Sequence, residues 1–331
     1  MASKELHVRL SGLDPSARRA LSDEGAWPTL RRICGRADST HSAMAGYYPM
    51  LAREFGLDTD AGLPVAALEA LAYGEASPEY RMRADPVHLM PAGDQLVMLD
   101  QGLLSLSQDE AKGLVDEVLK LFAEDGWEID VLRPDCWHLR LPMAPDIRTT
   151  PVDEVFGHSI QHALPVGADA MAWHRILTEV QGLLHTSEIN RVREVQGDYV
   201  VNSLWFWGGG RLPKPLSSEW QEVWTNDAFA TGLAIHSNIP CKPLPETLTA
   251  IEAILPEGKN LLVITLPLMS TLESMEKNWW APLAVALMQG RLRKLTIRWP
   301  GSPVYSITSS QYRWRLWRSS VSPKEFFADA S

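Results

Sequence analysis

The stretch from Asn190 to Pro213, NRVREVQGDYVVNSLWFWGGGRLP, decides how the rest of the chain is interpreted. It contains arginines, a polar turn, and a β-rich run through Trp205, Phe206 and Trp207 that ends in three consecutive glycines. Glycine lacks a Cβ and tolerates positive φ, so such a run lets backbone approach a ligand closely. The pattern is neither a P-loop nor a dinucleotide fingerprint. The residues alone leave two interpretations, a phosphate cradle and a tight turn after a buried strand.

Regular patterns on both sides of this stretch indicate alternating strands and helices. ELHVRLSGL at residues 5–13 alternates apolar and polar residues, which predicts a strand with one buried face. A helix is expected to begin near Pro28, because proline is tolerated in the first helical turn. NLLVITL at residues 260–266 and KLTIRW at residues 294–299 are short apolar runs typical of buried strands. The fold class is therefore α/β, with a doubly wound core sheet.

The middle of the chain has a different order of expected elements, with strands and helices in the pattern of an α+β unit. Its best-specified helix begins after Ser107, with Glu110 three residues on as in a capping box. A longer helix is expected within residues 169–194, with the following residues on its buried side: Met171, Ile176, Val180, Leu183 and Leu184. We therefore expect a discontinuous core of residues 1–75 and 190–331, interrupted by an inserted α+β domain of residues 76–189.

Composition excludes some classes of function. The 331 residues are 45% hydrophobic and carry a formal net charge of −10, which argues against general affinity for a nucleic-acid backbone. No secretory signal is recognised, and no window reaches the roughly 20 apolar residues that span a bilayer, so no membrane partner and a cytoplasmic location are expected. The three cysteines, Cys34, Cys136 and Cys241, are far apart and are expected to be reduced, mostly buried thiols.

Three other patterns each allow two interpretations. His158 and His162 are spaced as metal ligands on a helix, but surface or capping histidines fit better because no third ligand is indicated. The strand-like YRMRADPVHL places Arg83 and Asp85 on one face, either toward a ligand or in an ordinary salt bridge. SSQYRWRLWRS at residues 309–319 interleaves aromatic residues with arginines, as in a partner-binding surface or a half-buried edge strand.

The quoted stretch, extended to Ile189, resembles the junction in archaeal-type cofactor-independent phosphoglycerate mutases where an inserted domain returns to a phosphatase-like core. That family repeats an Asn, an Arg three residues on, a second Asn and a W-x-W-G-x-G run. The matching residues are Asn190, Arg193, Asn202, Trp205, Trp207, Gly208 and Gly210. Upstream, GYYP, AALEALAYGE and YRMRADPVHL followed by SQDEAKGLV come in the family's order. The whole chain also resembles the bacterial regulatory-protein family of RpfE type.

The resemblance implies an alkaline-phosphatase-like core with an inserted domain. In active relatives, Asp and His ligands hold two divalent metals that activate a serine, while arginines hold the substrate. Here the first strand ends in Ser11-Gly12 instead of Asp-Gly, and Asp14 is displaced. The nucleophile position falls on Ala37, although Ser39 and Ser42 are close by. The expected strands at residues 260–266 and 294–299 also lack the family's Asp-His run. The residues that bind the two metals in active relatives are therefore expected to be missing.

The resemblance and these departures together predict a catalytically degenerate, regulatory binding protein with no cofactor. Its ligand would be a phosphorylated or carboxylated small molecule, or a protein partner. The expected ligand-binding residues are Arg83, Asp85, Asn190, Arg193, Asn202, Gly208 and Gly210.

Two alternatives stay open at this point. One is an active metal-dependent phosphoglycerate mutase or phosphatase, with Ser39 or Ser42 as the nucleophile and Asp14, Asp38 and His41 as ligands of Mn or Zn. The other is a protein-interaction scaffold that uses the aromatic and arginine-rich segment after Tyr312.

Overall fold

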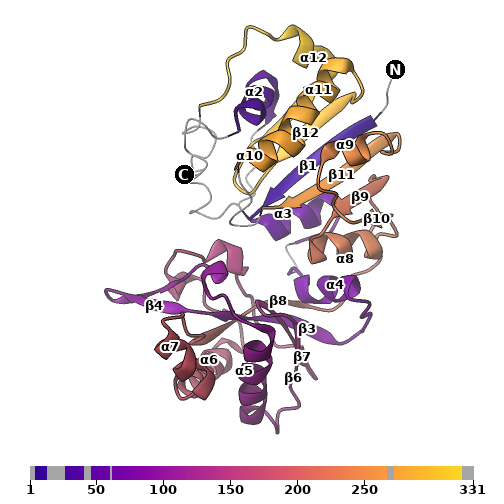
Figure 1. Ribbon diagram of the computed structural model, residues 1–331. Coiled ribbons are helices and arrows are strands. Elements are labelled where there is room, and N and C mark those ends of the chain that lie inside the picture. The colour runs from indigo at the N-terminus through magenta and orange to yellow at the C-terminus, as the bar shows by residue number, and fades with distance from the viewer. Residues whose placement is uncertain (1–3, 13–26, 41–45, 60–61, 267–271, 323–331) are drawn as a thin grey trace. The chain divides into compact units, whose positions relative to one another are not determined.

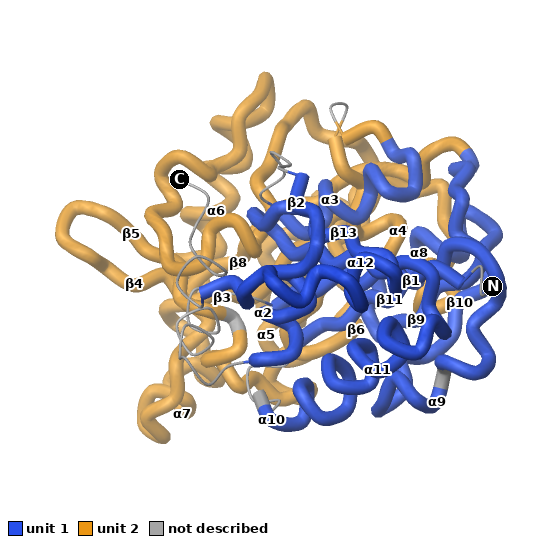
Figure 2. The backbone as a smooth tube through the Cα atoms, turned by 90° about the horizontal axis from the view of Figure 1, so that it is seen from above, with its two compact units in different colours: residues 1–57, 215–331 blue, residues 58–214 orange. Residues whose placement is uncertain are grey.

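The computed structural model describes residues 4–12, 27–40, 46–59, 62–266 and 272–322. The chain divides into two compact units, which Figure 2 colours separately. Unit 1 consists of residues 1–57 and 215–331, and unit 2 consists of residues 58–214. Unit 2 is thus inserted into unit 1. None of the helices in the described part of the chain has the length and apolarity needed to cross a membrane.

Unit 1 is built on a seven-stranded sheet in the order β10-β9-β11-β1-β12-β13-β2. The first five strands of this order run parallel, whereas β13 is antiparallel to both of its neighbours. The strands are β1 Lys4–Ser11, β2 Asp38–Thr40, β9 Glu222–Thr225, β10 Cys241–Lys242, β11 Gly258–Thr265, β12 Lys294–Arg298 and β13 Val304–Thr308. The central strand β1 therefore pairs with two strands that follow unit 2 in the sequence.

Helices lie on both faces of this sheet (Figure 1). They are α2 Pro28–Arg36, α3 Tyr47–Glu54, α8 Ala228–His236, α9 Leu248–Glu252, α10 Leu272–Met275, the π-helical segment Glu276–Trp280, α11 Ala281–Gln289 and α12 Ser309–Trp314. Leu6, Val8 and Leu10 of β1 pack with the α2 and α11 side chains in one apolar core. On the opposite face, α3 contacts α8 through Tyr48 and Phe229, whose ring centroids are 5.3 Å apart. The predicted doubly wound α/β arrangement is confirmed.

Unit 2 contains a four-stranded antiparallel sheet in the order β6-β7-β3-β8 and a separate β4-β5 hairpin. The strands are β3 Tyr80–Val87, β4 Leu89–Ala92, β5 Gln95–Met98, β6 Glu128–Arg133, β7 Cys136–Leu141 and β8 Ser203–Gly210. The helices are α4 Val65–Ala72, α5 Gln108–Leu121, α6 Ala170–His185 and α7 Glu188–Gln196, with short 3-10 turns at Gln101–Leu103, Val152–Glu154 and Ile160–His162. Apolar residues of α5 and α6 cover one face of the sheet, and α4 contacts β3 and β8.

The boundaries between the units differ from the expected ones at residues 75 and 190. Residues 58–75 and 190–214 belong to unit 2. The reason is strand pairing, because β8 is antiparallel to β3 from Ser203↔Val87 to Gly210↔Arg81. The quoted stretch therefore completes the inserted unit, and the chain returns to unit 1 only after it.

Four local expectations need comment. The capping box is confirmed, since Ser107 Oγ accepts from the Glu110 backbone N–H and Glu110 accepts from the Ser107 backbone N–H. Both faces of β1 are buried, because helices cover each side. The single helix expected within 169–194 is two helices, because Ser187 caps a new one at Glu188. Met171 of α6 is 76% exposed; the buried residues of that helix are Trp173, Leu177, Val180 and Leu184.

The segment after Thr308 forms α12 and no edge strand. Thr308 and Gln311 make a second capping box, which satisfies backbone N–H groups at the start of the helix. The alternation of aromatic and basic residues is therefore overridden by a local helix-start signal.

Candidate functional site

The two asparagines of the quoted stretch are held by backbone groups of unit 2. Asn190 Nδ2 donates to the carbonyl oxygens of Leu184 and Val201 at 2.9 and 2.7 Å, and its Oδ1 accepts from the Val201 N–H at 2.9 Å. Asn202 Oδ1 accepts from the Leu89 N–H at 2.7 Å, and its Nδ2 donates to the Leu89 carbonyl at 2.8 Å. Asn190 thus ties α7 to Leu184 and Val201, and Asn202, just before β8, is tied to Leu89 of β4; their role in ligand binding stays a prediction.

Arg193 joins three segments of unit 2. It is 1% exposed, its Nε donates to the Tyr199 carbonyl at 3.0 Å, and its Nη1 is 2.7 Å from Glu110 Oε1. Its Nη2 donates to the Leu104 carbonyl. Each nitrogen of the guanidinium thus has a partner inside the unit. The arginine expected to hold a ligand stabilises the start of α5 and the loop before β8.

The glycine run of β8 allows α4 to approach the strand. Gly208 has φ +62°, and a Cβ placed there would lie 2.9 Å from the Cβ of Val65. A Cβ at Gly210 would lie 2.5 Å from the Cβ of Pro64. A larger residue at either position would push the helix away, since such separations are shorter than real carbon contacts allow. The close approach expected of this run is therefore made to a helix of the same unit.

This approach places Glu69 of α4 against charged residues of β3. Arg83 Nη1 lies 3.0 and 2.8 Å from the two carboxylate oxygens of Glu69, and Arg83 Nε lies 2.8 Å from Asp85 Oδ1. The Trp207 indole donates to Asp85 Oδ2 at 2.7 Å. Glu69, Arg83 and Asp85 are all at most 4% exposed. Arg83 and Asp85 thus form a salt bridge, which was one of the two interpretations of this strand, and Glu69 joins it from the helix; their role in ligand binding stays a prediction.

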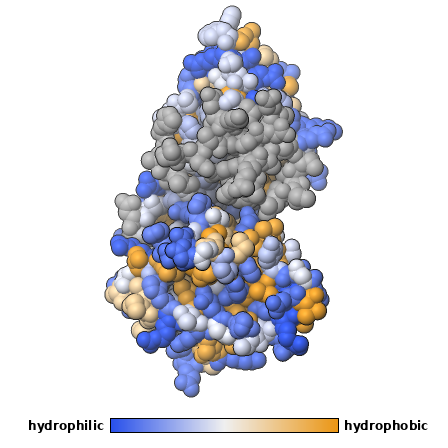
Figure 3. Space-filling view, turned by 90° about the vertical axis from the view of Figure 1, so that its left-hand side faces the viewer, coloured by the Kyte–Doolittle hydropathy of each residue, from blue (hydrophilic) through white to orange (hydrophobic). Residues whose placement is uncertain are grey.

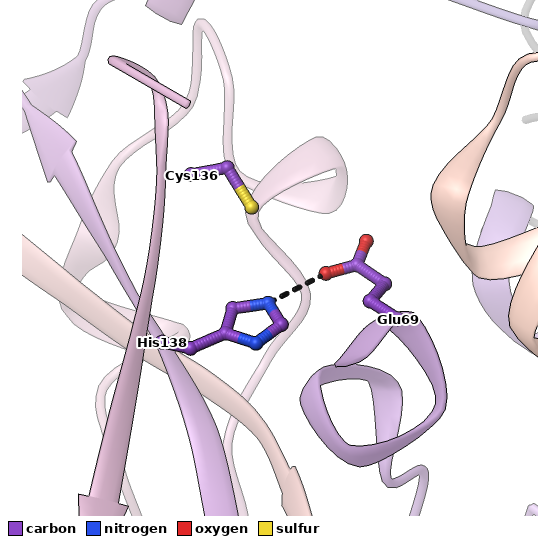
Figure 4. A group of neighbouring side chains, drawn as sticks. All are labelled: Glu69, Cys136 and His138. Atoms are coloured by element: carbon purple, nitrogen blue, oxygen red, sulfur yellow. Dashed lines mark hydrogen bonds and ion pairs between the residues drawn. The ribbon is translucent and has the colours of Figure 1, made fainter. Parts of the chain in front are cut away.

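Two further side chains of β7 join this group. Cys136 and His138 are two residues apart on the strand and so lie on the same side of it, where Figure 4 shows them facing Glu69. His138 Nε2 is 3.1 Å from Glu69 Oε2, and the donor atoms of Glu69, Cys136 and His138 all lie within 4.8 Å of one another. Cys136 is 1% exposed and His138 is fully buried. We call Glu69, Arg83, Asp85, Cys136 and His138 the buried cluster.

The buried cluster perturbs the acid–base behaviour of its members. Burial alone would raise the pKa of Glu69, but Arg83 and His138 outweigh it and lower that pKa to about 2. Burial raises the pKa of Asp85 to about 6, against the opposing effect of Arg83. Burial also lowers the pKa of His138 and raises that of the Cys136 thiol. The imidazole is therefore neutral at physiological pH. Its Nε2–H donates to the Glu69 carboxylate, so the lone pair lies on Nδ1, and Nε2 becomes a metal ligand in the other tautomer.

In unit 1, polar side chains occupy the face of β1 that lies toward α3. Arg9 of β1 and Arg298 of β12 are opposite each other in the register of the sheet. Arg9 Nε is 2.6 Å from Glu54 Oε1, and Arg298 Nη1 is 3.9 Å from the same oxygen. We call Arg9, Arg298 and Glu54 the arginine pair with its shared carboxylate. It lies near the carboxyl ends of parallel strands, where ligands bind in open α/β sheets.

The hydroxyl groups at the ends of the core strands lie beside each other. Ser11, the last residue of β1, donates through Oγ to Thr265 Oγ1 at 3.0 Å, and Thr265 is the last residue of β11. Thr225 ends β9. These strand ends thus carry neutral oxygen groups.

The proposed metal ligand Asp38 is engaged with the C-terminal segment. Arg315 lies 2.7 Å from its Oδ1 and Arg318 lies 3.5 Å away, while Gln311 Nε2 donates to Oδ2 at 2.9 Å. The hydrogen bond from Arg315 holds the pKa of Asp38 below its usual range. Ser39 is an exposed residue of β2, opposite Tyr305 of β13.

The remaining catalytic and metal candidates, Asp14, His41 and Ser42, lie outside the described residues. His158 and His162 are exposed, and His158 Nδ1 contacts the Phe156 carbonyl at 2.8 Å. These two residues do not share a helix face, because the segment between them is a 3-10 turn. The surface interpretation of both histidines agrees with their position.

Two hollows of about 270 and 220 Å³ lie among the described residues of unit 2, and the expected ligand-binding residues line neither of these two. The larger is lined by Leu104, Leu106 and Asp135, and the smaller by Leu177, Thr178 and Trp205, among others. On the side shown in Figure 3, hydrophobic and hydrophilic side chains of unit 2 are interspersed. In unit 1, Trp314 and Trp317 of the C-terminal segment are 76% and 77% exposed.

The sequence did not predict that Glu69, Cys136 and His138 form a group. A local signal existed for each part: Glu69 is the one charged residue within the apolar helix VAALEALA, and Cys136 and His138 alternate in a strand. A lone acid in a buried helix requires a partner. Its partners come from strands that the sequence does not place beside it.

No protein-family model matches the chain. It is 26% identical over 156 residues to a probable 2,3-bisphosphoglycerate-independent phosphoglycerate mutase of Geobacter sulfurreducens; the match covers 45% of this chain and 38% of that protein. The PH0037 protein of Pyrococcus horikoshii has a similar structure, with a TM-score of 0.52, 14% sequence identity, and 93% of this chain and 88% of that one covered. A cofactor-independent phosphoglycerate mutase from Thermoplasma acidophilum gives a TM-score of 0.46 at 15% identity, with 93% and 90% covered.

Part of the chain is thus similar in sequence to a probable cofactor-independent phosphoglycerate mutase, and its fold is an α/β fold like that of the PH0037 protein, as the sequence predicted. The match to the curated relative spans well under half of that relative's length.

Proposed function

We propose that the chain is a phosphoglycerate-mutase-like protein that binds an anionic small molecule without turning it over. Its role would be regulatory and cytoplasmic, as in the bacterial RpfE-type proteins that its sequence resembles. The anion would be phosphorylated or carboxylated. The proposal goes beyond the relationship to the mutases and rests on the chemistry of unit 1.

The observation that carries the proposal is the set of residues at the carboxyl ends of the core strands. β1, β9 and β11 end in Ser11, Thr225 and Thr265, and β12 ends in Arg298. Phosphoryl transfer without a diffusible cofactor uses carboxylate and imidazole ligands to hold divalent metals. Among the described residues, the last positions of these four strands provide hydroxyl groups and a guanidinium instead. Such groups bind an anion but do not lower the pKa of a serine nucleophile as a metal does.

The arginine pair indicates where an anion would bind. Arg9 and Arg298 are 4% and 6% exposed and both lie beside the single carboxylate of Glu54. These three side chains together carry one excess positive charge. The attraction of a buried positive charge for an anion is stronger than that of an exposed one. A phosphate or carboxylate accepts paired hydrogen bonds from a guanidinium. We place the anion here because both guanidinium groups lie near the carboxyl ends of parallel strands, where ligands bind in open α/β sheets.

Turnover is tested with a coupled assay for conversion of 3-phosphoglycerate to 2-phosphoglycerate, with added Mn²⁺ and again with EDTA. We expect no turnover above a protein-free blank under either condition. Metal-dependent turnover would overturn the proposal and favour an active mutase that uses Mn or Zn at Asp14, Asp38 and His41, with Ser39 or Ser42 as nucleophile.

Binding is tested by isothermal titration with 3-phosphoglycerate and with inorganic phosphate. Arg298→Gln is expected to weaken the binding of either anion at least about tenfold, as loss of a charge-assisted contact does. Arg191→Gln is the matched control, because Arg191 is a surface residue of unit 2 whose side chain is 69% exposed. Equal affinity in the wild-type protein and Arg298→Gln would show that the arginine pair is not the site.

A further inference from the structure

We propose that Glu69, Cys136 and His138 form a binding site for a zinc-like divalent transition metal inside unit 2. This site is independent of the anion site of unit 1. The three side chains come from two elements, α4 and β7, so that a bound ion would join the helix to the sheet.

The donor set favours this class of metal. One carboxylate oxygen, one imidazole nitrogen and one thiolate sulfur are the ligands that Zn²⁺ takes in proteins. The combination of sulfur and nitrogen selects zinc-like ions over Mg²⁺ or Ca²⁺, which prefer oxygen alone. All three residues are buried, so a solvated surface cluster is not an alternative explanation for their proximity.

The geometry is compatible with one ion between the three atoms. Tetrahedral bonds of about 2.0–2.3 Å place neighbouring donor atoms about 3.3–3.8 Å apart. His138 Nε2 and Glu69 Oε2 are 3.1 Å apart, and no pair of the three donors exceeds 4.8 Å. Side-chain shifts of about 1 Å or less would thus complete three ligands, and the fourth position is left to a water molecule.

The surrounding charge also suits a dication. On binding, the Cys136 thiol forms its bond to the metal and releases its proton to solvent. Glu69, Asp85 and the thiolate then carry three negative charges, and the Arg83 guanidinium carries one positive charge. The two remaining negative charges equal the charge of the ion. Glu69 can keep Oε1 on Arg83, 3.0 Å away, while Oε2 turns to the metal.

The burial of all three ligands points to a structural ion. Catalytic zinc sites also have three protein ligands and a water molecule, but they keep that fourth position open to substrate. Cys136 and His138 are at most 1% exposed, which leaves no path for a substrate in the folded unit. The ion would therefore stabilise unit 2, since metal that binds only the folded chain shifts the unfolding equilibrium.

The test uses the full-length chain, stripped with EDTA, desalted and titrated with Co²⁺. We expect about one equivalent to produce a near-ultraviolet thiolate-to-cobalt band and visible bands of four-coordinate cobalt, both removed by added Zn²⁺. A double variant, Cys34→Ser with Cys241→Ser, keeps Cys136 as the remaining one of three cysteines and is expected to keep both bands. Absence of the thiolate band in the wild-type protein or in this double variant overturns the proposal.

Single substitutions provide the second measurement. Cys136→Ser is expected to abolish the thiolate band, and Glu69→Gln to abolish the rise in melting temperature that Zn²⁺ causes in the wild-type protein. Glu188→Gln, at an exposed position of unit 2, is the control and keeps that rise. A thiolate band that survives Cys136→Ser refutes the assignment. Should Cys136→Ser not fold, the double variant decides the question alone, because its bands can come only from Cys136.

Discussion

Strand β1 of unit 1 and strand β3 of unit 2 both carry charged residues at alternate, buried positions, but the two strands compensate these charges differently. In β3, Arg83 has Asp85 on its own strand and Glu69 on the helix above it, and each carboxylate has a further partner. In β1, Arg9 faces Arg298 on the next strand, and both lie beside Glu54. In the first arrangement the arginine has two carboxylate partners and is closed on itself, whereas in the second two guanidinium groups share one carboxylate.

This difference in charge compensation distinguishes arginines that hold the fold together from arginines that we propose to bind an anion. A buried arginine whose carboxylate partners are complete offers no free positive charge to an anion, and removal of one partner strongly destabilises the fold. A buried pair of like charges costs stability, and an anion would relieve that cost. The resemblance to the mutases drew attention to Arg83 and Arg193, yet their partners are supplied within unit 2. The strands on which two arginines share the carboxylate of Glu54 are the better place to look for an anion.

The largest effect is expected from Arg83→Met, which breaks the closed arrangement. The change leaves Glu69 and Asp85 buried without their shared cation, so the free energy of unfolding should fall by about 3–5 kcal/mol. Urea unfolding followed by circular dichroism measures this loss. The control is Arg191→Met, whose exposed ion pair with Glu188 contributes at most about 0.5 kcal/mol. A loss for Arg83→Met as small as that of the control would contradict the closed arrangement.

A smaller effect is expected from Gly208→Ala, which moves α4 away from β8. The new methyl group would meet Val65 at 2.9 Å in a backbone of positive φ, so we expect a loss of about 1–3 kcal/mol. Gly182→Ala in α6 is the matched control, because a Cβ there meets no atom within 4 Å and alanine favours helix by about 0.5–1 kcal/mol. Thermal unfolding of the two variants should give shifts of opposite sign; shifts of the same sign would show that α4 does not rest on the glycine.

The smallest effect is expected from His7, which lies on β1, the strand that carries Arg9. Burial lowers the pKa of His7 to about 3, and Arg9, Lys294 and Lys259 act in the same direction. Glu5 Oε2 lies 3.6 Å from the ring but is also paired with Arg293. The folded pKa is thus below the unfolded value, so the unfolded chain takes up a proton below about pH 6.5 while the folded chain does not.

Stability should therefore fall as the pH drops from 7 to 5.5, by about 1 kcal/mol from this residue. His7→Gln removes the titration and should lose about 1 kcal/mol less than the wild-type protein over the same pH interval. Urea unfolding at pH 7 and pH 5.5 gives the change in free energy of unfolding for each protein. The other titrating groups contribute equally to both proteins, so the difference between the two changes reports on His7 alone. Identical pH dependence in both would show that His7 is solvated in the folded state.

Local signals in the sequence predicted local structure well. Alternation predicted β1, proline predicted the start of α2 at Pro28, and the Ser107–Glu110 spacing predicted the capping box. Helix-capping residues were also present in the sequence at Ser187, where α7 begins, and at Thr308, where α12 begins. The sequence interpretation followed the repeating pattern of apolar and aromatic residues at these two positions and missed both helix starts. Short helix-start motifs therefore deserve more weight than repeating apolar patterns that run across them.

What the sequence could not supply was pairing between distant segments. The unit boundary depends on β8 joining β3, whose paired residues Asp85 and Trp205 are far apart in the chain. The buried cluster likewise depends on α4 resting on the sheet, which brings Glu69 to within 3.1 Å of His138. Such contacts follow from the whole packing arrangement, and neither spacing nor composition of one chain encodes them locally.

The position of β1 has a consequence for how the protein is made. Its neighbours in the sheet are β11 and β12, which follow the whole of unit 2 in the sequence. Unit 2 is continuous in the chain and can fold as soon as residue 214 has left the ribosome. β1 is therefore synthesised before unit 2 but pairs with its neighbours only after unit 2 has been made, and until then its apolar residues Leu6, Val8 and Leu10 are not covered by the packing seen in the folded unit.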